Sequence, residues 1–354
     1  MMRILILLTL ISGLSVASES RAQEDLATFG PQDAGATLLV RSTTDIVVFA
    51  PVIEAFITTR AGVRIDYEQW GSNDLAMLST ENCRSGSGSA DLVISSAVDL
   101  QVQLVNDGCA ATHRSAATAA LPASRNWRNE VFGVTEEPAV LIYNTELVAA
   151  SEVPASRFDL IDLLRPVDSR FAGRVATYDI EESGLGYLFA FVDSQQANTF
   201  GRLLEAFGRS GAVATCCSAE IIDAVADGRY LIAYNVLGSY ALARAEEDTR
   251  IGVRAPVDYT LMLSRAALIP KEATEAGIAG QFIDFMLSPD GRAAMVRSRL
   301  LVRIGGPDDA DLDLPGGGPS SLRPIALSPV LLAGLDRHKR RIFLEQWQRN
   351  LRQR

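Results

Sequence analysis

The chain has 354 residues, of which 48% are hydrophobic and 21% are charged. This composition is that of a folded protein of about two domains, and it excludes general disorder. A net charge of −10 provides no basic face, so we predict no nucleic-acid partner. With only two histidines, His113 and His338, a histidine-rich metal site is excluded and few candidates for a catalytic base are left.

The first 22 residues have the pattern of a secretory signal peptide. Arg3 supplies a positive charge, residues 4–16 are apolar, and Ala22 fits the end of a cleavage site. The apolar run of 13 residues is shorter than the ~20 residues of a membrane span, and no cysteine follows it for a lipid anchor. We predict a signal peptide at 1–22 and an exported, periplasmic protein. The mature chain would carry a net charge of −11, because two arginines and one glutamate are removed.

The rest of the chain alternates strand and helix patterns after a polar segment at 23–35, for which we expect no regular structure. Apolar runs predict strands at 36–41, 63–67, 91–95, 139–143, 174–178 and 230–234. Most of these runs are followed by helix-capping residue types and an apolar-periodic stretch, which predicts mostly parallel sheets with helices on both faces. At the C-terminus, the basic run 337–341 precedes Ile342, Phe343 and Trp347. This pattern predicts an amphipathic helix with a basic, solvated outer face.

Several segments together resemble a type II periplasmic solute-binding protein of bacterial ABC importers. They are the exported N-terminus, the strand with Ser-Thr-Thr-Asp at 38–45, and the segments 90–96, 131–144 and 224–233. Residues 281–292 are similar to the helix and Ser-Pro-Asp-Gly segment near the end of these proteins. The nearest subgroup is that of the ferric-iron and related solute binders.

The resemblance implies an α/β fold of two lobes, each a mostly parallel sheet flanked by helices, with the ligand in the cleft between them. We expect the first lobe at 36–134 plus 260–354 and the second at 139–255, with crossings near 135–138 and 253–259. Ligand binding is expected to close the lobes by a hinge motion. The implied partners are a small-molecule solute and an ABC permease in the inner membrane. We expect a monomer with no cofactor, no metal and no enzymatic activity.

The loops that follow the predicted strands carry small hydroxyl and amide side chains, which suit hydrogen bonding to a polar solute. In open parallel sheets, ligands bind beyond the carboxyl ends of the strands, where helices begin. Each residue alone is explained by helix capping, but the set on successive loops predicts a lined cleft. The candidate ligand-binding residues are Ser42, Thr43, Thr44, Trp70, Ser72, Ser95, Ser96, Glu137, Tyr178, Ser183, Asn235 and Tyr240.

The expected solute is a small polar or anionic organic molecule, with the anionic kind favoured. Ferric-iron binders of this subgroup carry adjacent tyrosines after an asparagine at the end of a strand, whereas this chain has Asn235 and then only Tyr240. Iron stays an alternative through an oxygen site of Tyr178, Tyr240 and Glu181, because phenolates are hard donors. A ligand sensor that feeds a membrane histidine kinase is a second alternative with the same fold.

A secreted hydrolase has less support. The Gly-Ser-Gly sequence at 86–88 lies in a loop rather than at a strand-to-helix elbow. A cysteine enzyme built on Cys216 or Cys217 would need a histidine partner, and neither histidine has recognisable catalytic surroundings.

The four cysteines allow three full pairings in an oxidising compartment. Cys83 and Cys109 fall in the first expected lobe, and Cys216 and Cys217 in the second. A pairing between lobes would oppose hinge closure, so we predict Cys83–Cys109, with two apolar, unbonded cysteines as the alternative. The adjacent pair is a vicinal disulfide, a partly buried pair or two free thiols.

Overall fold

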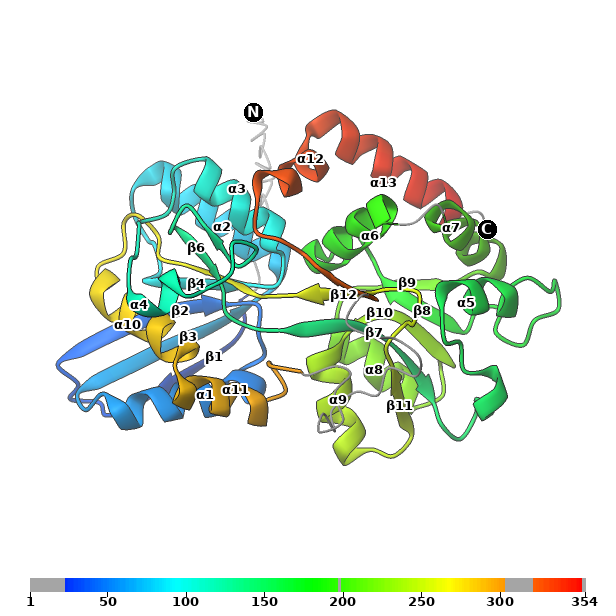
Figure 1. The fold of residues 1–354 in the computed structure, drawn as a ribbon, viewed down its shortest axis with the longest axis horizontal. Helices are drawn as coiled ribbons and strands as arrows, with labels where there is room; N and C mark the ends of the chain where they lie inside the picture. Colours follow the sequence, from blue (N-terminus) through cyan, green and yellow to red (C-terminus); the bar gives the residue numbers. More distant parts are fainter. Residues whose placement is uncertain (1–22, 197–198, 303–320, 352–354) are drawn as a thin grey trace, which may run out of the picture.

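A computed structural model describes residues 23–196, 199–302 and 321–351 of the chain. The predicted signal peptide at 1–22 lies outside these ranges. Within them, no helix combines the length and the apolar character needed to cross a membrane. The described elements form two sheets with helices packed around them, as the sequence predicted (Figure 1).

The first sheet has the strand order β1-β3-β2-β4-β13-β6-β5. The central strands β2, β3 and β4 are parallel, whereas β1, β13, β6 and β5 pair antiparallel with their neighbours. The strand bounds are β1 Gln23–Phe29, β2 Ala36–Ser42, β3 Val63–Trp70, β4 Leu92–Ser95, β5 Asn126–Trp127, β6 Val131–Gly133 and β13 Ala266–Leu268. Helices α1 (Ile46–Thr59), α2 (Ser72–Ser85), α3 (Val98–Asn106), α4 (Ala116–Ala119), α10 (Ala276–Leu287) and α11 (Pro289–Arg297) surround this sheet. We call this body the first lobe.

The second sheet has the order β14-β12-β7-β10-β8-β9, and β11 also pairs with β7. Its bounds are β7 Glu137–Asn144, β8 Val175–Tyr178, β9 Val213–Thr215, β10 Ile232–Leu237, β11 Ile251–Arg254, β12 Thr260–Leu263 and β14 Leu322–Pro324. Helices α5 (Arg157–Leu163), α6 (Gly184–Gln196), α7 (Phe200–Ser210), α8 (Ser218–Ala226) and α9 (Gly238–Glu247) pack around it, with a short 3-10 turn η1 at Ala150–Glu152. We call this body the second lobe.

Helix α1 shows how the sequence sets the packing. Its apolar residues Phe49, Val52, Ile53 and Phe56 recur at helical spacing and are all buried. Phe56 stacks on Phe282 of α10 with ring centroids 4.6 Å apart. The same face therefore joins the N-terminal helix to a helix that comes more than 200 residues later in the chain.

The N-terminal segment differs from the expectation of irregular structure at 23–35. Residues 23–29 form β1, which pairs antiparallel with β3 from Gln23 opposite Trp70 to Phe29 opposite Ile65. Most of its side chains are exposed, so its sequence lacks the apolar run of a buried strand. The hydrogen bonds of a sheet edge hold β1 in place, and these leave no pattern in the side chains.

Within the described ranges the chain passes between the lobes at two neighbouring places, and a third passage, from α11 to β14, falls partly outside those ranges. It leaves the first sheet after β6 and enters the second at β7, through residues 134–136. It returns between β12 and β13, at Ser264 and Arg265, which is later than the expected crossing at 253–259. The two crossings are bonded to each other, since the Val134 amide donates to the Arg265 carbonyl at 2.9 Å.

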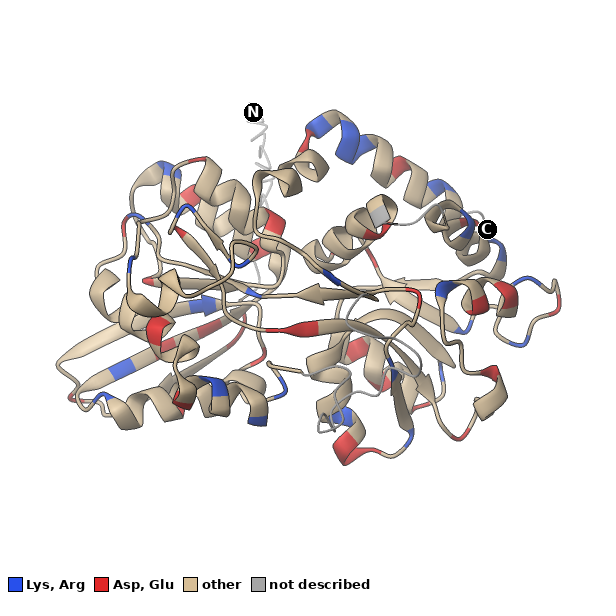
Figure 2. Cartoon of the chain, in the orientation of Figure 1, with Lys and Arg blue, Asp and Glu red and all other residues tan. Residues whose placement is uncertain are grey.

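The C-terminal part also differs from the expected division, which placed 260–354 in the first lobe. Strand β12 pairs with β7 and β14 in the second sheet. After the short segments η3 (Pro329–Leu331) and α12 (Leu332–Leu335), helix α13 (Arg337–Leu351) packs along α7 of the second lobe. Trp347 is buried there, and Phe343 packs edge-on against Tyr187 of α6. Lysine and arginine residues lie along the length of α13, as expected for its solvated face (Figure 2).

Both cysteine pairs are disulfides. Cys83 of α2 is bonded to Cys109, which follows α3, so the predicted pairing is confirmed. Cys216 and Cys217 are bonded to each other between β9 and α8, so the vicinal disulfide is the one formed of the three states that the sequence left open.

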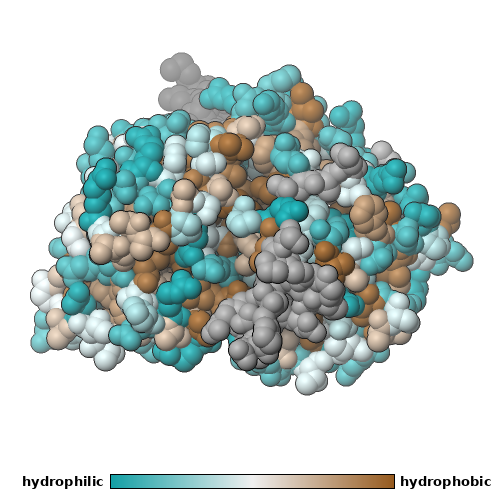
Figure 3. All heavy atoms as spheres, in the orientation of Figure 1, coloured by the Kyte–Doolittle hydropathy of each residue, from teal (hydrophilic) through white to brown (hydrophobic). Residues whose placement is uncertain are grey.

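On the face of the molecule drawn in Figure 3, hydrophobic residues are scattered in small groups among hydrophilic ones.

Candidate functional site

A cavity of about 330 Å³ lies between the two lobes. Its first-lobe wall comes from the loops after β2, β3 and β4, and its second-lobe wall from the ends of β8 and β10 and the starts of α6 and α8. Strand ends and helix starts therefore meet here from both sheets, which is where the parallel-sheet argument placed a binding cleft.

Seven of the twelve predicted site residues line this cavity. Thr43 and Ser96 face each other across β2 and β4, with their hydroxyl oxygens 3.1 Å apart. Because the Ser96 amide also donates to the Thr43 hydroxyl at 2.9 Å, these two loops are fixed relative to each other. The seven lining residues are Thr43, Trp70, Ser72, Ser96, Tyr178, Ser183 and Tyr240.

Three other predicted residues, Ser42, Thr44 and Ser95, lie at or just after the same strand ends, but their hydroxyls accept hydrogen bonds from the protein itself. The Ser42 hydroxyl accepts a hydrogen bond from the Thr44 amide at 3.0 Å, and both side chains are fully buried. The Ser95 hydroxyl accepts one from the Ala97 amide at 3.1 Å. Ser42 and Ser95 therefore stabilise the turns that precede α1 and α3, a local structural role close to the capping that was the alternative explanation for each of them.

Asn235 does not line the cavity. It lies in β10 where the register with β7 shifts, and its φ is 58°, in the left-handed region. Its side-chain amide nitrogen donates to the Asp193 carboxylate at 2.7 Å, and Asp193 forms a buried ion pair with Arg157 at 3.1 Å. The bulge thus turns Asn235 into the interior of the second lobe, which an alternating strand pattern cannot reveal.

Glu137 is fully buried behind the cavity and holds Arg265. The Arg265 guanidinium donates to the two carboxylate oxygens of Glu137 at 2.9 and 3.3 Å and to the Thr44 hydroxyl at 2.9 Å. The Thr135 hydroxyl donates to Glu137 at 2.7 Å and accepts from the Arg265 amide at 2.8 Å. Breaking such a buried pair by removing one partner costs about 3–5 kcal/mol. Arg265 joins the two crossings and one cavity wall, and its sequence context gave no sign of this role.

Hydrogen bonds cross between the lobes on both sides of the cavity. Tyr240 of α9 donates to the Asp45 carboxylate at 2.9 Å and accepts from the Asp45 amide at 3.0 Å. The Gly184 amide at the start of α6 donates to the Ser72 hydroxyl at 2.9 Å. Asn73 donates to the Glu181 carbonyl at 3.0 Å. The lobes are therefore in contact around the cavity.

The two cavity tyrosines are neutral phenols. Burial raises the pKa of Tyr178 to about 12, despite its hydrogen bond with Ser218 at 2.6 Å. Burial also raises the pKa of Tyr240 well above its ordinary value, and the nearby Arg265 opposes this only in part. Neither phenol is poised to lose its proton at neutral pH.

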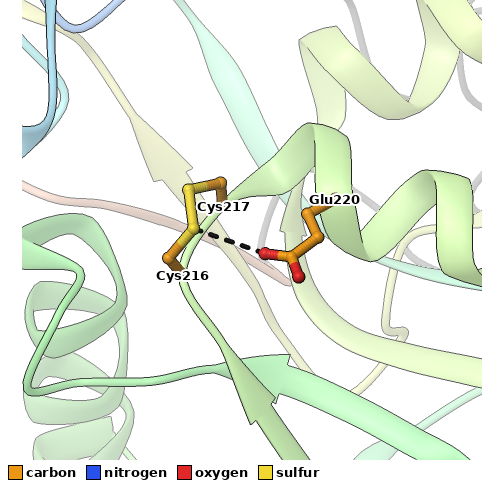
Figure 4. Close-up of side chains that lie close together, drawn as sticks. All are labelled: Cys216, Cys217 and Glu220. Atoms are coloured by element: carbon orange, nitrogen blue, oxygen red, sulfur yellow. Dashed lines mark hydrogen bonds between the residues drawn. A yellow bond between two sulfur atoms is a disulfide. The ribbon is translucent and has the colours of Figure 1, made fainter. Parts of the chain in front are cut away.

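Acidic groups and a disulfide complete the lining, and none of them was predicted from the sequence as part of the site. Glu24, Asp45 and Glu220 contribute carboxylates, and the Cys216–Cys217 disulfide lies at the start of α8. One Glu220 oxygen lies 3.4 Å from the Cys216 sulfur and accepts from Thr215 at 2.6 Å (Figure 4). Among the described residues, these two cysteines and Glu220 are the group of metal-ligand types whose donor atoms lie within 4.8 Å of one another. Asp45 was visible in the sequence only as a helix-capping residue.

Two sheets joined by crossing strands, with a polar cavity between them, define a two-lobed solute-binding protein. The chain belongs to the family of bacterial extracellular solute-binding proteins, whose model matches residues 52–303. A solved substrate-binding protein of an ABC transporter from Agrobacterium tumefaciens is 33% identical, with a TM-score of 0.85 over 92% of this chain and 98% of that one. The predicted family is confirmed, and the protein is a substrate-binding protein of an ABC transporter, extracellular or periplasmic, with a solute ligand and a membrane permease as partner.

More distant structures share the fold alone. Iron-bound HitA from Pseudomonas aeruginosa is 19% identical, with a TM-score of 0.61 over 74% of this chain and 84% of that one. AfuA from Actinobacillus pleuropneumoniae, solved with fructose-6-phosphate, is 15% identical, with a TM-score of 0.69 over 91% of this chain and all of that one (100%). No curated protein matches the sequence.

Proposed function

We propose that the mature chain captures a small polar solute in the cavity between its lobes, closes over it as a monomer and delivers it to the permease. The observation that carries this proposal is the cavity itself, which is lined by both lobes and bordered by hydrogen bonds between them. Because these bonds need both lobes in place, a solute that fills the cavity would favour the closed arrangement. The protein acts by binding, without a catalytic step.

Export through a cleaved signal peptide at 1–22 is part of the same proposal. Cleavage after Ala22 would make Gln23 the first residue, at the start of β1. The mature chain would then begin directly with a strand of the first sheet.

The hinge lies at the two crossings, residues 134–136 and Ser264–Arg265. Arg265 bonds Glu137 and Thr44 at the same time, so it connects this hinge to the cavity wall. A change in the angle between the lobes would therefore move the residues that line the cavity.

Ferric iron has less support as the cargo. Each cavity tyrosine is hydrogen-bonded within the protein, Tyr178 to Ser218 and Tyr240 to Asp45. Their raised pKa values oppose the phenolate form that Fe(III) prefers. An organic solute needs only their neutral hydroxyls.

A variant that fills the cavity tests the proposal. Ala219 is exposed and lines the cavity in the first turn of α8, so Ala219→Trp would occupy solute space without changing the core. Small-molecule extract from spent growth medium should raise the Tm of the mature protein and lower its radius of gyration in solution scattering. We expect Ala219→Trp to lose both responses.

The matched control is Ala172→Trp, which adds the same ring to an exposed turn before β8, outside the cavity lining. It should respond as the unchanged protein does. An extract that alters neither Tm nor radius, or an Ala219→Trp variant that responds fully, would contradict the proposal.

A further inference from the structure

The cation in the cavity lining is already neutralised. Arg265 is 1% exposed, and its guanidinium donates to both carboxylate oxygens of Glu137 and to Thr44. The Arg265 Nη1 atom, which donates to the Thr44 hydroxyl, also donates to the Thr43 carbonyl at 3.3 Å. Little of its charge or donor capacity is left for an anionic solute.

The starts of α1 and α6 at the cavity are also occupied. The Asp45 and Ile46 amides at the start of α1 donate to Tyr240 and Gln69, each at 3.0 Å. The Gly184 amide at the start of α6 is bonded to the first lobe in the same way. An anion at a helix start needs free N–H groups, and these ones are taken by the protein's own oxygens.

Like the starts of α2 and α9, the start of α8 has no side-chain cap. Glu220, however, lies in the first turn of this helix, where its carboxylate offsets the partial positive charge of the helix end. At this helix start, an anionic solute would therefore meet the negative charge of Glu220 beside the free donors.

Carboxylates supply the unpaired charge in the lining. Glu24, Asp45 and Glu220 form no ion pair with any described residue. One oxygen of Asp45 accepts from Tyr240 and one of Glu220 accepts from Thr215, and no described residue bonds the second oxygen of either. The cavity therefore offers acceptors and negative charge to a solute that carries N–H donors.

Beside the neutral hydroxyl and amide side chains, the lining has apolar and aromatic surfaces. Trp70 is 8% exposed, and its indole nitrogen is already bonded to Glu68 at 3.0 Å, so its ring is what it can offer the cavity. The Cys216–Cys217 disulfide brings two sulfur atoms without a hydrogen-bond donor. Aromatic faces attract cations, and both surfaces suit a carbon skeleton.

We propose that the solute is a small organic cation, with an ammonium or related nitrogen group held between Asp45 and Glu220 and its apolar part against Trp70 and the vicinal disulfide. This inference rests on the proposed function and reverses the sign of charge expected from the loop sequences alone. The carboxylate of Asp45 comes from the first lobe and that of Glu220 from the second. A cation between them would draw the two lobes together.

Thermal shift with defined probes tests the charge of the solute. The cationic probes are thiamine, spermidine and choline, and the anionic probes are citrate, fructose 6-phosphate and pyridoxal phosphate. We expect the largest rise in Tm from a cationic probe, and a smaller rise at higher ionic strength because salt screens the attraction. For that probe, titration calorimetry on Glu220→Gln should show an affinity roughly fivefold to tenfold lower.

Glu205→Gln is the matched control, since Glu205 is also an exposed helix glutamate of the second lobe but lies on α7, outside the cavity lining. Its affinity should equal that of the unchanged protein. The inference is overturned if an anionic probe gives the largest shift, if no cationic probe raises Tm, or if Glu220→Gln binds as tightly as Glu205→Gln. An anion that binds and lowers the radius of gyration would refute the inference and leave the proposed function standing. Failure of every probe and of the medium extract would refute both.

Discussion

Asp99 is a buried carboxylate that makes stability depend on pH. It lies in the first turn of α3, is 3% exposed, and has one oxygen without a hydrogen-bond partner among the described residues. Burial raises its pKa to about 7 from an ordinary value of 3.8, although nearby Arg340 opposes the shift. Between these two values the folded protein keeps a proton that the unfolded chain has lost. Asp99 therefore contributes stability below pH 3.8, and this contribution is lost as the pH rises through 7.

Asp99→Asn would keep the shape of this side chain and remove its titration. A shift of about three pKa units corresponds to about 4 kcal/mol. We expect the unfolding free energy of Asp99→Asn, relative to the unchanged protein, to increase by up to that amount between pH 4 and pH 8. Urea denaturation at several pH values measures this difference. Asp33→Asn, at an exposed turn, should show none. Parallel pH curves for Asp99→Asn and the unchanged protein would show that Asp99 is not the group responsible.

The candidate site was predictable where a residue acts from its own loop. Thr43 and Ser96 follow strands whose apolar runs are plain in the sequence, and both reach the cavity. Asn235 does not line the cavity as predicted, because a bulge turns its side chain into the second lobe. Arg265 was missed because its role depends on two crossings that meet only in the folded chain. Contacts between segments far apart in sequence leave no local pattern.

At the scale of elements, apolar periodicity predicted the inner strands and the helices that bury a full face. It failed where an element is defined by its neighbours. Strand β1 is held by its hydrogen bonds to β3, and α13 is amphipathic in sequence but carries no sign of which lobe it will cover. The expected crossing at 253–259 was also wrong, because β12 continues the second sheet before the chain returns. Sequence therefore located the elements better than it assigned them to lobes.

The Cys83–Cys109 disulfide ties α2 to the loop after α3. It closes a loop with a sequence separation of 26 residues, which restricts the unfolded chain by about 3 kcal/mol. We expect the double substitution Cys83→Ala and Cys109→Ala to lower the unfolding free energy by roughly that amount in urea denaturation. Removing the Cys216–Cys217 pair in the same way is the control. Its sequence separation is 1, so it closes almost no loop, and the loss should be clearly smaller. Equal losses from the two double variants would argue against this loop-closure origin.

At the scale of the whole molecule, Tyr240 of the second lobe is one of the residues that bond the first lobe. Its hydroxyl exchanges two hydrogen bonds with Asp45 across the cavity, at 2.9 and 3.0 Å. Tyr240→Phe keeps the ring and removes both bonds, which together contribute about 1–2 kcal/mol to the closed arrangement. Because the proposed function links closure to binding, the medium extract should need to be about 5- to 30-fold more concentrated to give half of the full Tm rise. At an intermediate concentration of the extract, solution scattering should give a larger radius of gyration for Tyr240→Phe than for the unchanged protein.

The control is Tyr143→Phe, which removes a hydroxyl from the second sheet outside the cavity lining. It should match the unchanged protein in both measurements. If Tyr240→Phe also matched it, the contact between Tyr240 and Asp45 would have no part in closure, and the hinge would be governed by the crossings alone.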